Sequence, residues 1–267
     1  MFRDITIGQY VDGDSIIHRL DARVKILLSM VYIILLFVVD SLTAYVLIAA
    51  FTAALIFISK IPVRYVLRGL KPILYILIFT AAINLFMTGG ETVLWASERF
   101  VRIKITKEGA VNAVRMAFRL VLLVMGTSLL TLTTTPIMLT DGIEKILEPF
   151  SVIKVPSHEI AMMMTIAIRF IPTLSEETDK IIKAQKARGA DFESGSIFRR
   201  VKAMVPILIP LFISAFKRAD DLAVAMDSRC YNSGKKRTRM KQMKMTWRDA
   251  VAAALMLVFC TGIILIR

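Results

Sequence analysis

The sequence has few of the residues from which most catalytic and metal sites are built. Its 267 residues include two cysteines, Cys230 and Cys260, and two histidines, His18 and His158. Two cysteines cannot form a disulfide framework or a cysteine-rich metal site, and the histidines do not have the spacing of metal ligands. A glycine-rich phosphate-binding loop is also absent from the sequence. We therefore expect a chain that is not an enzyme and that binds no cofactor or metal itself.

Negative charge is scarce as well. The chain has 35 lysines and arginines against 21 aspartates and glutamates, which gives a formal net charge of +14. Nucleic acid, anionic lipid head groups or the positive-inside bias of a membrane protein could each account for this excess. With 56% hydrophobic residues and a mean hydropathy of +0.65, the chain is more apolar than a soluble domain of its length. Lipid is therefore the expected solvent, and the positive-inside bias needs no further partner.

Long apolar runs without charged residues are abundant. Each approaches the roughly 20 residues that cross the hydrocarbon core of a bilayer, and flanking cations such as Lys25 and Arg119 can snorkel to the interface. We predict an all-α integral membrane protein with about five transmembrane helices. The first run follows a polar, acidic arm and is expected to remain as an uncleaved span. The five runs comprise residues 26–39, 42–59, 73–88, 120–135 and 250–266.

The distribution of cations predicts the orientation, because short loops rich in lysine and arginine stay in the cytoplasm. The N-terminal arm and the connection at residues 60–71 carry several cations, whereas the connection between the first two runs carries only Asp40. The N-terminus is therefore expected in the cytoplasm. Residues 89–109 are of mixed charge, and residues 100–106 alternate apolar and polar side chains as a strand does. A small external hairpin is expected there.

The segment between the fourth and fifth runs is expected on the cytoplasmic side. A short helix is predicted over residues 136–147, because a proline stands at its first turn and the Glu148-Pro149 step ends it. Two long helices, residues 156–188 and residues 197–229, are predicted to follow. The chain is thus divided into four spans with the N-terminal arm, a cytoplasmic coupling region and a last span, over residues 1–135, 136–245 and 246–267.

Both long helices alternate charged with apolar residues over much of their length. Ser157 is expected to cap the first helix, and Pro206 and Pro210 are expected to bend the second. Amphipathic helices at the membrane face fit this pattern. The alternative is a short membrane hairpin of residues 160–174 and 204–216, although both segments are below spanning length.

The ends of the two long helices repeat one another at an offset of 41 residues, which is 229 minus 188. Acidic, apolar, alanine and arginine positions then match between residues 179–189 and residues 220–230. Chance similarity between two amphipathic helices is the alternative explanation. Each copy ends in an arginine between small residues, and Gly189 is a natural helix terminator because it tolerates a left-handed backbone. The two tips are Ala187-Arg188-Gly189 and Ser228-Arg229-Cys230.

An arginine at a helix end can simply offset the negative end of the helix dipole, a contribution of roughly 0.3 to 1 kcal/mol. Two matched copies favour a docking role, in which each guanidinium makes a bidentate contact with an acidic groove on a partner. Only residues 191–196 separate the helices, so the second returns across the first. Since a helix of about 33 residues is roughly 50 Å long, Arg188 and Arg229 should lie far apart and meet two similar sockets.

These motifs together resemble the transmembrane T component of energy-coupling factor transporters, the vitamin and metal importers of prokaryotes. The resemblance covers essentially the whole chain, and it rests on the two tips, on Asp-Ala-Arg-Val-Lys at residues 21–25 and on Arg-Phe-Ile-Pro at residues 169–172. It implies a scaffold in the cell membrane that couples two ATP-binding-cassette ATPases, which use ATP and magnesium, to a membrane-embedded substrate-binding subunit. Arg188 and Arg229 would each enter a groove of one ATPase.

The resemblance also implies a contact surface for the substrate-binding subunit. The crossed helices would transmit motion through an apolar, methionine-rich face, since thioether side chains repack easily. Simple packing is the more common role of such residues. The second tip departs from the usual Ala-Arg-Gly pattern with Ser228 and Cys230, which are still small. The residues expected to contact the substrate-binding subunit are Met162, Met163, Met164, Phe212 and Phe216.

A self-contained channel or transporter is the alternative function. It would usually carry ionisable residues inside its spans, whereas Thr80, Asn84 and residues 131–135 provide the polarity here and suit helix contacts. The basic stretch at residues 235–244 directly precedes the last span. It is therefore expected to bind membrane lipids at the inner leaflet and not nucleic acid.

Overall fold

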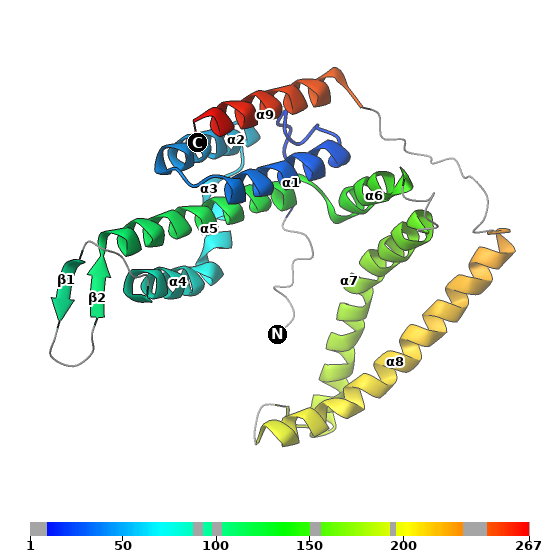
Figure 1. Ribbon diagram of the computed structural model, residues 1–267. Helices are drawn as coiled ribbons and strands as arrows, with labels where there is room; N and C mark the ends of the chain where they lie inside the picture. The colour runs from blue at the N-terminus through cyan, green and yellow to red at the C-terminus, as the bar shows by residue number, and fades with distance from the viewer. Residues whose placement is uncertain are drawn as a thin grey trace. The chain divides into compact units, whose positions relative to one another are not determined.

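The computed structural model describes residues 10–87, 93–97, 103–149, 156–192, 196–231 and 245–266. The described chain is mainly helical (Figure 1). By their contacts the elements form two compact units: a membrane unit with α1 to α6, both strands and α9, and a helix-pair unit with α7 and α8. The elements are α1 Ala22–Val38, α2 Leu42–Ser59, α3 Val63–Leu70, η1 Lys71–Ile73, α4 Leu74–Met87, β1 Val93–Ser97, β2 Ile103–Thr106, α5 Lys107–Thr133, α6 Pro136–Leu147, α7 Ser157–Ala187, α8 Ile197–Ser228 and α9 Trp247–Leu265.

The described part of each apolar run lies almost entirely within a helix of the membrane unit. Among the described residues, four helical segments are long and apolar enough to cross a membrane: α2, the stretch Val63–Leu85 that joins α3, η1 and α4, then α5 and α9. α1 covers the first run with 17 residues, at the lower end of the roughly 17–25 residues that span a bilayer. The prediction of an all-α integral membrane protein is confirmed, and α1 as a fifth span stays a prediction.

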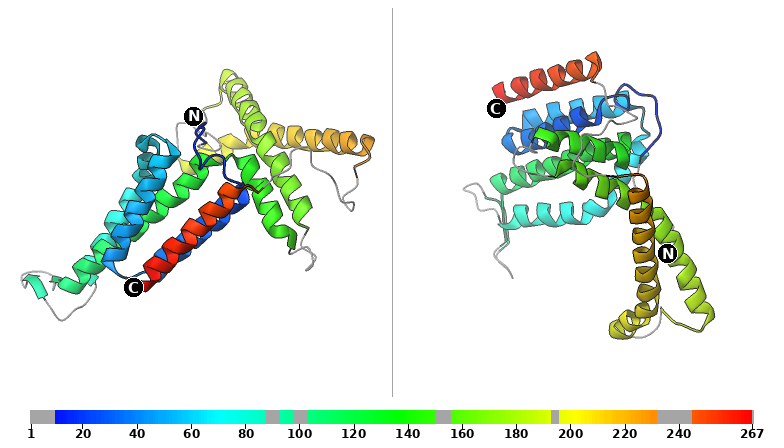
Figure 2. Two further views of the ribbon diagram at one scale, coloured as in Figure 1. Left: turned by 90° about the horizontal axis from the view of Figure 1, so that it is seen from above. Right: turned by 90° about the vertical axis from the view of Figure 1, so that its right-hand side faces the viewer.

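The core of the membrane unit lies where α1, α2, α5 and α9 pack together, and α1 and α9 run side by side in Figures 1 and 2. Tyr32 of α1 is buried there, and its hydroxyl lies 2.9 Å from Thr52 Oγ1 and donates to the Leu122 carbonyl at 3.1 Å. Gly126 makes room for this ring, since a Cβ at that position would lie 2.3 Å from Tyr32 Cε1. Tyr32 thus joins three helices, whereas the side chains of Thr80 and Asn84, which we expected to suit helix contacts, donate to carbonyls of α4 itself.

Two cations that we expected to snorkel make hydrogen bonds within the unit. The Lys25 ammonium is buried and donates to the carbonyls of His18 and Thr133, at 3.2 and 2.9 Å, and to Thr134 Oγ1 at 3.3 Å. Arg119 of α5 donates to Tyr45 Oη at 2.8 Å. The prediction of snorkelling was wrong for Lys25, because backbone carbonyls left free at helix ends surround its ammonium. Arg119 also donates to the Val39 carbonyl at 3.1 Å and pairs with the exposed Asp40 at 3.5 Å, so its snorkelling stays a prediction.

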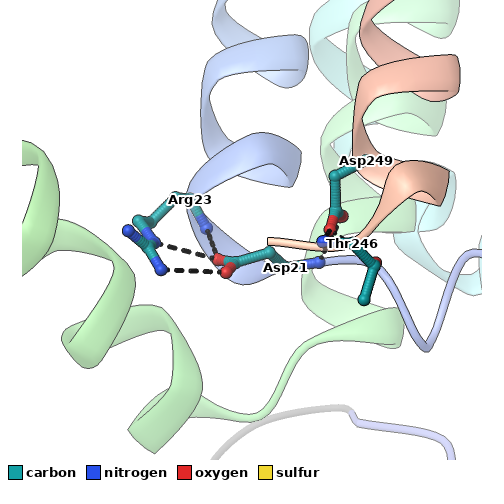
Figure 3. A network of polar contacts seen from close by, with 4 residues as sticks. All are labelled: Asp21, Arg23, Thr246 and Asp249. Carbon is teal, nitrogen blue, oxygen red and sulfur yellow. Dashed lines mark hydrogen bonds and ion pairs between the residues drawn. The ribbon is translucent and has the colours of Figure 1, made fainter. Parts of the chain in front are cut away.

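The N-termini of α1 and α9 are tied together at one end of the unit (Figure 3). Asp249 accepts hydrogen bonds from the Asp21 amide at 2.8 Å, the Thr246 amide at 2.7 Å and the Thr246 hydroxyl at 2.8 Å. Asp21 in turn caps α1 by accepting from the Arg23 amide at 2.9 Å, and its carboxylate pairs with the Arg23 guanidinium at 3.2 Å. The segment that enters the first span, residues 21–25, therefore has a structural role, since it anchors the start of the last span.

Two smaller predictions are confirmed in the same unit. β1 and β2 pair antiparallel, with Ser97 opposite Ile103, so the expected hairpin exists; residues 100–102 of the predicted strand lie outside the described residues. α6 has the predicted bounds and packs closely on α1, since a Cβ on Gly142 would lie 3.2 Å from the Ala22 Cβ. Contacts thus place α6 with the membrane unit, although its sequence neighbours in the coupling region do not belong there.

Candidate functional site in the paired helices

α7 and α8 have almost the predicted bounds and form an antiparallel pair. Both continue as single helices through their internal prolines, Pro172 in α7 and Pro206 and Pro210 in α8. The prediction of Ser157 as N-cap was wrong. Pro156 occupies the cap without a side-chain hydrogen bond, and Ser157 is the first helical residue. A residue with helical backbone does not act as the N-cap, which has extended backbone.

One polar contact joins α7 to α8 near the middle of the pair. Glu177 accepts a hydrogen bond from the Ser214 hydroxyl at 2.6 Å and pairs with the Arg218 guanidinium at 2.9 Å. Ser214 and Arg218 stand one turn apart on α8, so both reach the same carboxylate. The hydrogen bond from Ser214 and the ion pair with Arg218 hold the pKa of Glu177 below its usual value.

The sequence pattern predicted alternating charges on both helices but not the pairing of Glu177 with Arg218. A signal was present in the repeat, because Arg218 follows Glu177 by the same offset, 218 minus 177, or 41 residues. Two related helices that cross about a common axis bring equivalent positions together at the crossing. Opposite charges at equivalent positions of the repeat therefore mark the point where the helices meet.

A second contact closes the other end of the pair. The Tyr231 hydroxyl, just beyond α8, donates to Met162 Sδ at 2.8 Å, so the end of α8 lies near the start of α7. Met162 is thereby partly buried inside the unit, whereas Met163 and Met164 are exposed. The first tip consequently lies at the end of the pair where α7 passes into α8, and the second tip lies at the opposite end (Figure 1).

The first tip ends α7 with a left-handed residue. Gly189 has φ +85°, with nothing within 4 Å of where a Cβ would be. Its amide donates to the Lys186 carbonyl at 3.0 Å, and the Ala190 amide donates to the Gln185 carbonyl at 3.0 Å. These two bonds are those of a Schellman motif, which satisfies carbonyls left free at a helix end. The prediction of Gly189 as terminator is confirmed.

The second tip has the same backbone structure without a glycine. Cys230 has φ +54°, and its amide donates to the Asp227 carbonyl at 2.8 Å, while the Tyr231 amide donates to the Met226 carbonyl at 3.0 Å. Donors and acceptors are shifted from the first tip by the same offset, since 230 minus 189 and 227 minus 186 are both 41. The repeat therefore extends from sequence to hydrogen bonding, which chance similarity of two amphipathic helices does not require.

Both tip arginines are the C-cap residues of their helices and are exposed. Neither Arg188 nor Arg229 makes a side-chain hydrogen bond or ion pair with another described residue. Their neighbours Ala187, Ser228 and Cys230 are exposed too. Each tip therefore presents a guanidinium on a narrow helix end, with five donors available to a partner.

The helix pair also exposes a large apolar surface. Phe216 is 68% exposed, and side chains at steps of four residues along α8 form a stripe on one side of the helix. Four of the five residues predicted to contact a substrate-binding subunit are exposed in the pair, Met163, Met164, Phe212 and Phe216. The stripe on α8 comprises Met204, Leu208, Phe212 and Phe216. Apolar surface of this extent on a protein is typical of a contact with a partner or with lipid.

The described part of the chain holds no cluster of three or more histidine, cysteine, aspartate or glutamate side chains that could bind a metal ion. The helix pair exposes cations and apolar side chains that other molecules can contact.

Comparison with known proteins gives full-length matches. Residues 13–240 match the family described as cobalt transport protein. The chain is 57% identical over 265 residues to the energy-coupling factor transporter transmembrane protein EcfT of Clostridium kluyveri, which covers 99% of this chain and 97% of that protein. It is 54% identical over 267 residues to the protein of the same name from Ruminiclostridium cellulolyticum, covering 100% and 98%. The protein of that name from Bacillus subtilis is 42% identical over 267 residues, covering 100% of both chains.

Proposed function

This chain belongs to the family of energy-coupling factor transporter transmembrane proteins, and on that premise we propose that it links two ATP-binding-cassette ATPases to a membrane-embedded substrate-binding subunit. It is the multi-pass membrane component of such a transporter. The observation that supports the proposal most directly is the pair of tips. They share one backbone structure, and each exposes an arginine that has no side-chain partner among the described residues.

Each tip suits an acidic groove on one ATPase. A guanidinium carries donors in a rigid fork that matches a carboxylate bidentately. The small residues beside Arg188 and Arg229 leave the helix end narrow enough to insert. Because the two tips have the same structure, we expect them to bind two grooves of similar structure. A pair of homologous ATPases provides such grooves. ATP and magnesium would bind in those ATPases and not in this chain.

The helix pair can transmit movement of the sockets. α7 has 31 residues and α8 has 32, so each is a lever roughly 45–50 Å long. Glu177 ties the levers together through Ser214 and Arg218. When the ATPases close on ATP, movement of the sockets would turn the helix pair as one body, because Glu177 joins the two helices near their middle.

The exposed stripe of α8 is the surface through which we propose that this movement reaches the substrate-binding subunit. Phe212 and Phe216 would slide on an apolar face of that subunit, and Met163 and Met164 would repack. The substrate carried would be a vitamin or a metal ion, determined by the substrate-binding subunit. The tips would face the cytoplasm, as would the N-terminus, in agreement with the cation-rich connections of the membrane unit.

The proposal is tested by reversing the charge of both tips. The double variant R188E/R229E should insert into the membrane in normal amount and lose co-purification with the ATPases in mild detergent, because two repelled carboxylates replace the guanidiniums. The matched control K183E/K217E changes the net charge equally at exposed lysines of α7 and α8 and should retain the ATPases. ATPases that stay bound to the R188E/R229E variant would contradict docking at the tips.

A further inference from the structure

A cavity of about 410 Å³ opens in the membrane unit among α1, α2, α5, α9 and the segment that precedes α1. This volume lies in the range of about 300–1,000 Å³ found for ligand sites. Most of the side chains that line it are apolar. They include Ile17, Leu28, Phe51, Leu55, Leu129 and Leu255.

The polar side chains in the depth of the cavity are already paired with the protein. Tyr32 and Thr52 share a hydrogen bond, and Lys25 donates to three oxygens. The hydroxyls of Ser29 and Thr133 donate to carbonyls of their own helices. A polar ligand would find no convergent partners there, whereas a hydrocarbon chain would need none. The depth of the cavity therefore fits an alkyl chain.

One end of the cavity is cationic. Trp247 and Arg248, at the start of α9, line this end and also a smaller hollow beside it, which Asp14, Ile16 and Arg19 complete. Arg19 pairs with Asp14 at 3.3 Å, but the two side chains are 56% and 94% exposed, so this pair is weak and can yield to a competing anion. The Arg248 side chain has no hydrogen bond or ion pair with the described residues. Tryptophan with arginine is the composition of a membrane–water interface.

The length of the cavity matches one leaflet of a bilayer. Its lining on α9 runs from Trp247 to Met256, which is about 14 Å at the rise of an α-helix. The hydrocarbon core of a bilayer is roughly 30 Å thick, so half of it is about 15 Å. A single alkyl chain with an anionic head suits this length, the apolar lining and the cationic end.

We propose that this cavity is a phospholipid site, in which one acyl chain fills the space between α1, α2, α5 and α9 and the phosphate binds Arg19 and Arg248. Basic pockets between transmembrane helices recognise anionic head groups by the same chemistry. The site depends on the membrane unit alone and not on docking of ATPases. A bound chain would complete the packing of α9, whose start is held to α1 through Asp249 and Asp21.

The acyl-chain part of the proposal is tested with the full-length chain in liposomes that contain phosphatidylglycerol with a photoreactive group on its acyl chain. Cross-links mapped by mass spectrometry should concentrate on cavity residues such as Leu28 and Leu255. Ala252→Phe, which fills the cavity, should abolish this labelling. Ala254→Phe, on an exposed alanine of the same helix that does not line the cavity, should leave it unchanged. Equal labelling of all lipid-facing helices, unaffected by Ala252→Phe, would overturn the proposal.

The head-group part is tested by native mass spectrometry of the full-length chain with phosphatidylglycerol or phosphatidylcholine. The double variant R19Q/R248Q should lose the preference for phosphatidylglycerol by about tenfold, since it removes two charge-assisted contacts. R64Q/R68Q, at exposed arginines of α3, should keep that preference. An unchanged preference in R19Q/R248Q, or loss of the cross-links whenever the ATPases and a substrate-binding subunit are bound, would show another occupant and overturn the proposal.

Discussion

The membrane unit and the helix-pair unit handle their polar groups in opposite ways. In the membrane unit, Lys25, Tyr32 and Asp249 are buried and make several hydrogen bonds each within the unit. In the helix pair, Arg188 and Arg229 are exposed, and much of the apolar surface is uncovered. Lipid offers polar groups no partners, so the membrane unit must satisfy its own. The open surface of the helix pair fits the proposal that its partners lie on other chains.

This comparison predicts that polar substitutions cost stability in the membrane unit and association in the helix pair. The largest effect on folding is expected for Asp249→Ala, which leaves the amides of Asp21 and Thr246 without their acceptor. The loss should be about 3 kcal/mol, measured as thermal unfolding in detergent. Asp249→Asn keeps one acceptor oxygen, so its stability should lie between that of Asp249→Ala and that of the wild type. Asp220→Ala, at an exposed position of α8, should change little, and equal losses at both aspartates would remove the contrast between the units.

Gly126→Ala should have the next largest effect. Its new methyl group would lie 2.3 Å from Tyr32 Cε1, so the ring must shift and its hydrogen bonds to Thr52 and Leu122 must break or stretch. We expect a loss of about 2 kcal/mol in the same unfolding measurement. Gly262→Ala on α9 is the matched control, because nothing lies within 4 Å of its Cβ position. A tolerated alanine at position 126 would mean that α1 and α5 are less tightly packed than the structure shows.

Cys230→Gly tests the helix pair, where, in contrast to the two substitutions in the membrane unit, we expect a gain of stability. A non-glycine residue in the left-handed region costs roughly 1–2 kcal/mol. Glycine removes this cost, but its larger loss of conformational entropy on folding offsets part of the gain. We expect the end of α8 to gain about 1 kcal/mol of stability. Slower hydrogen exchange of its amides would measure this gain. The variant should still bind the ATPases, since Arg229 and the Schellman bonds remain. Gly189→Ala should show the reverse change at the first tip.

The smallest effect on stability is expected for Glu177→Gln, because this ion pair is partly exposed and solvent screens it. The pKa of Glu177 is lowered in the folded protein, so its stabilising contribution is complete above the ordinary pKa of a glutamate. That contribution is lost as the pH falls through the lowered value. The crossing of α7 and α8, followed by a spin-label distance across the pair, should loosen at low pH in the wild type. In the Glu177→Gln variant it should be loose at every pH, while Glu176→Gln should behave as the wild type.

Particular residues show which parts of this architecture can be predicted from sequence. The bounds of α6, α7 and α8 and the left-handed Gly189 were predictable, because prolines, glycines and apolar periodicity act within a turn or two of helix. The repeat of 41 residues also predicted two equivalent tips. Ser157 was predicted wrongly as the N-cap, because Pro156 directly before it occupies that position. Sequence patterns do not locate a helix end to within one residue.

The burial of the Lys25 ammonium and the hydrogen-bond partners of Asp249 could not be predicted from local patterns. Each depends on a segment far away in the chain, as when Asp249 accepts from the Asp21 amide 228 positions earlier. The pairing of Glu177 with Arg218 lay hidden among many exposed charges. Only the crossing of the two helices selects it.

By itself, the sequence determined that the chain lives in a membrane, where α6, α7 and α8 begin and end, and that two helices finish in matching arginine tips. These are local properties, since hydrophobic length and cap chemistry are read along one helix. Only the tertiary structure decided which polar groups turn inward, where α7 and α8 touch, and that a chain-sized cavity lies between α1, α2, α5 and α9. Those features arise from packing between helices distant in sequence, and packing is set by shape and by hydrogen-bond partners that a linear pattern does not contain.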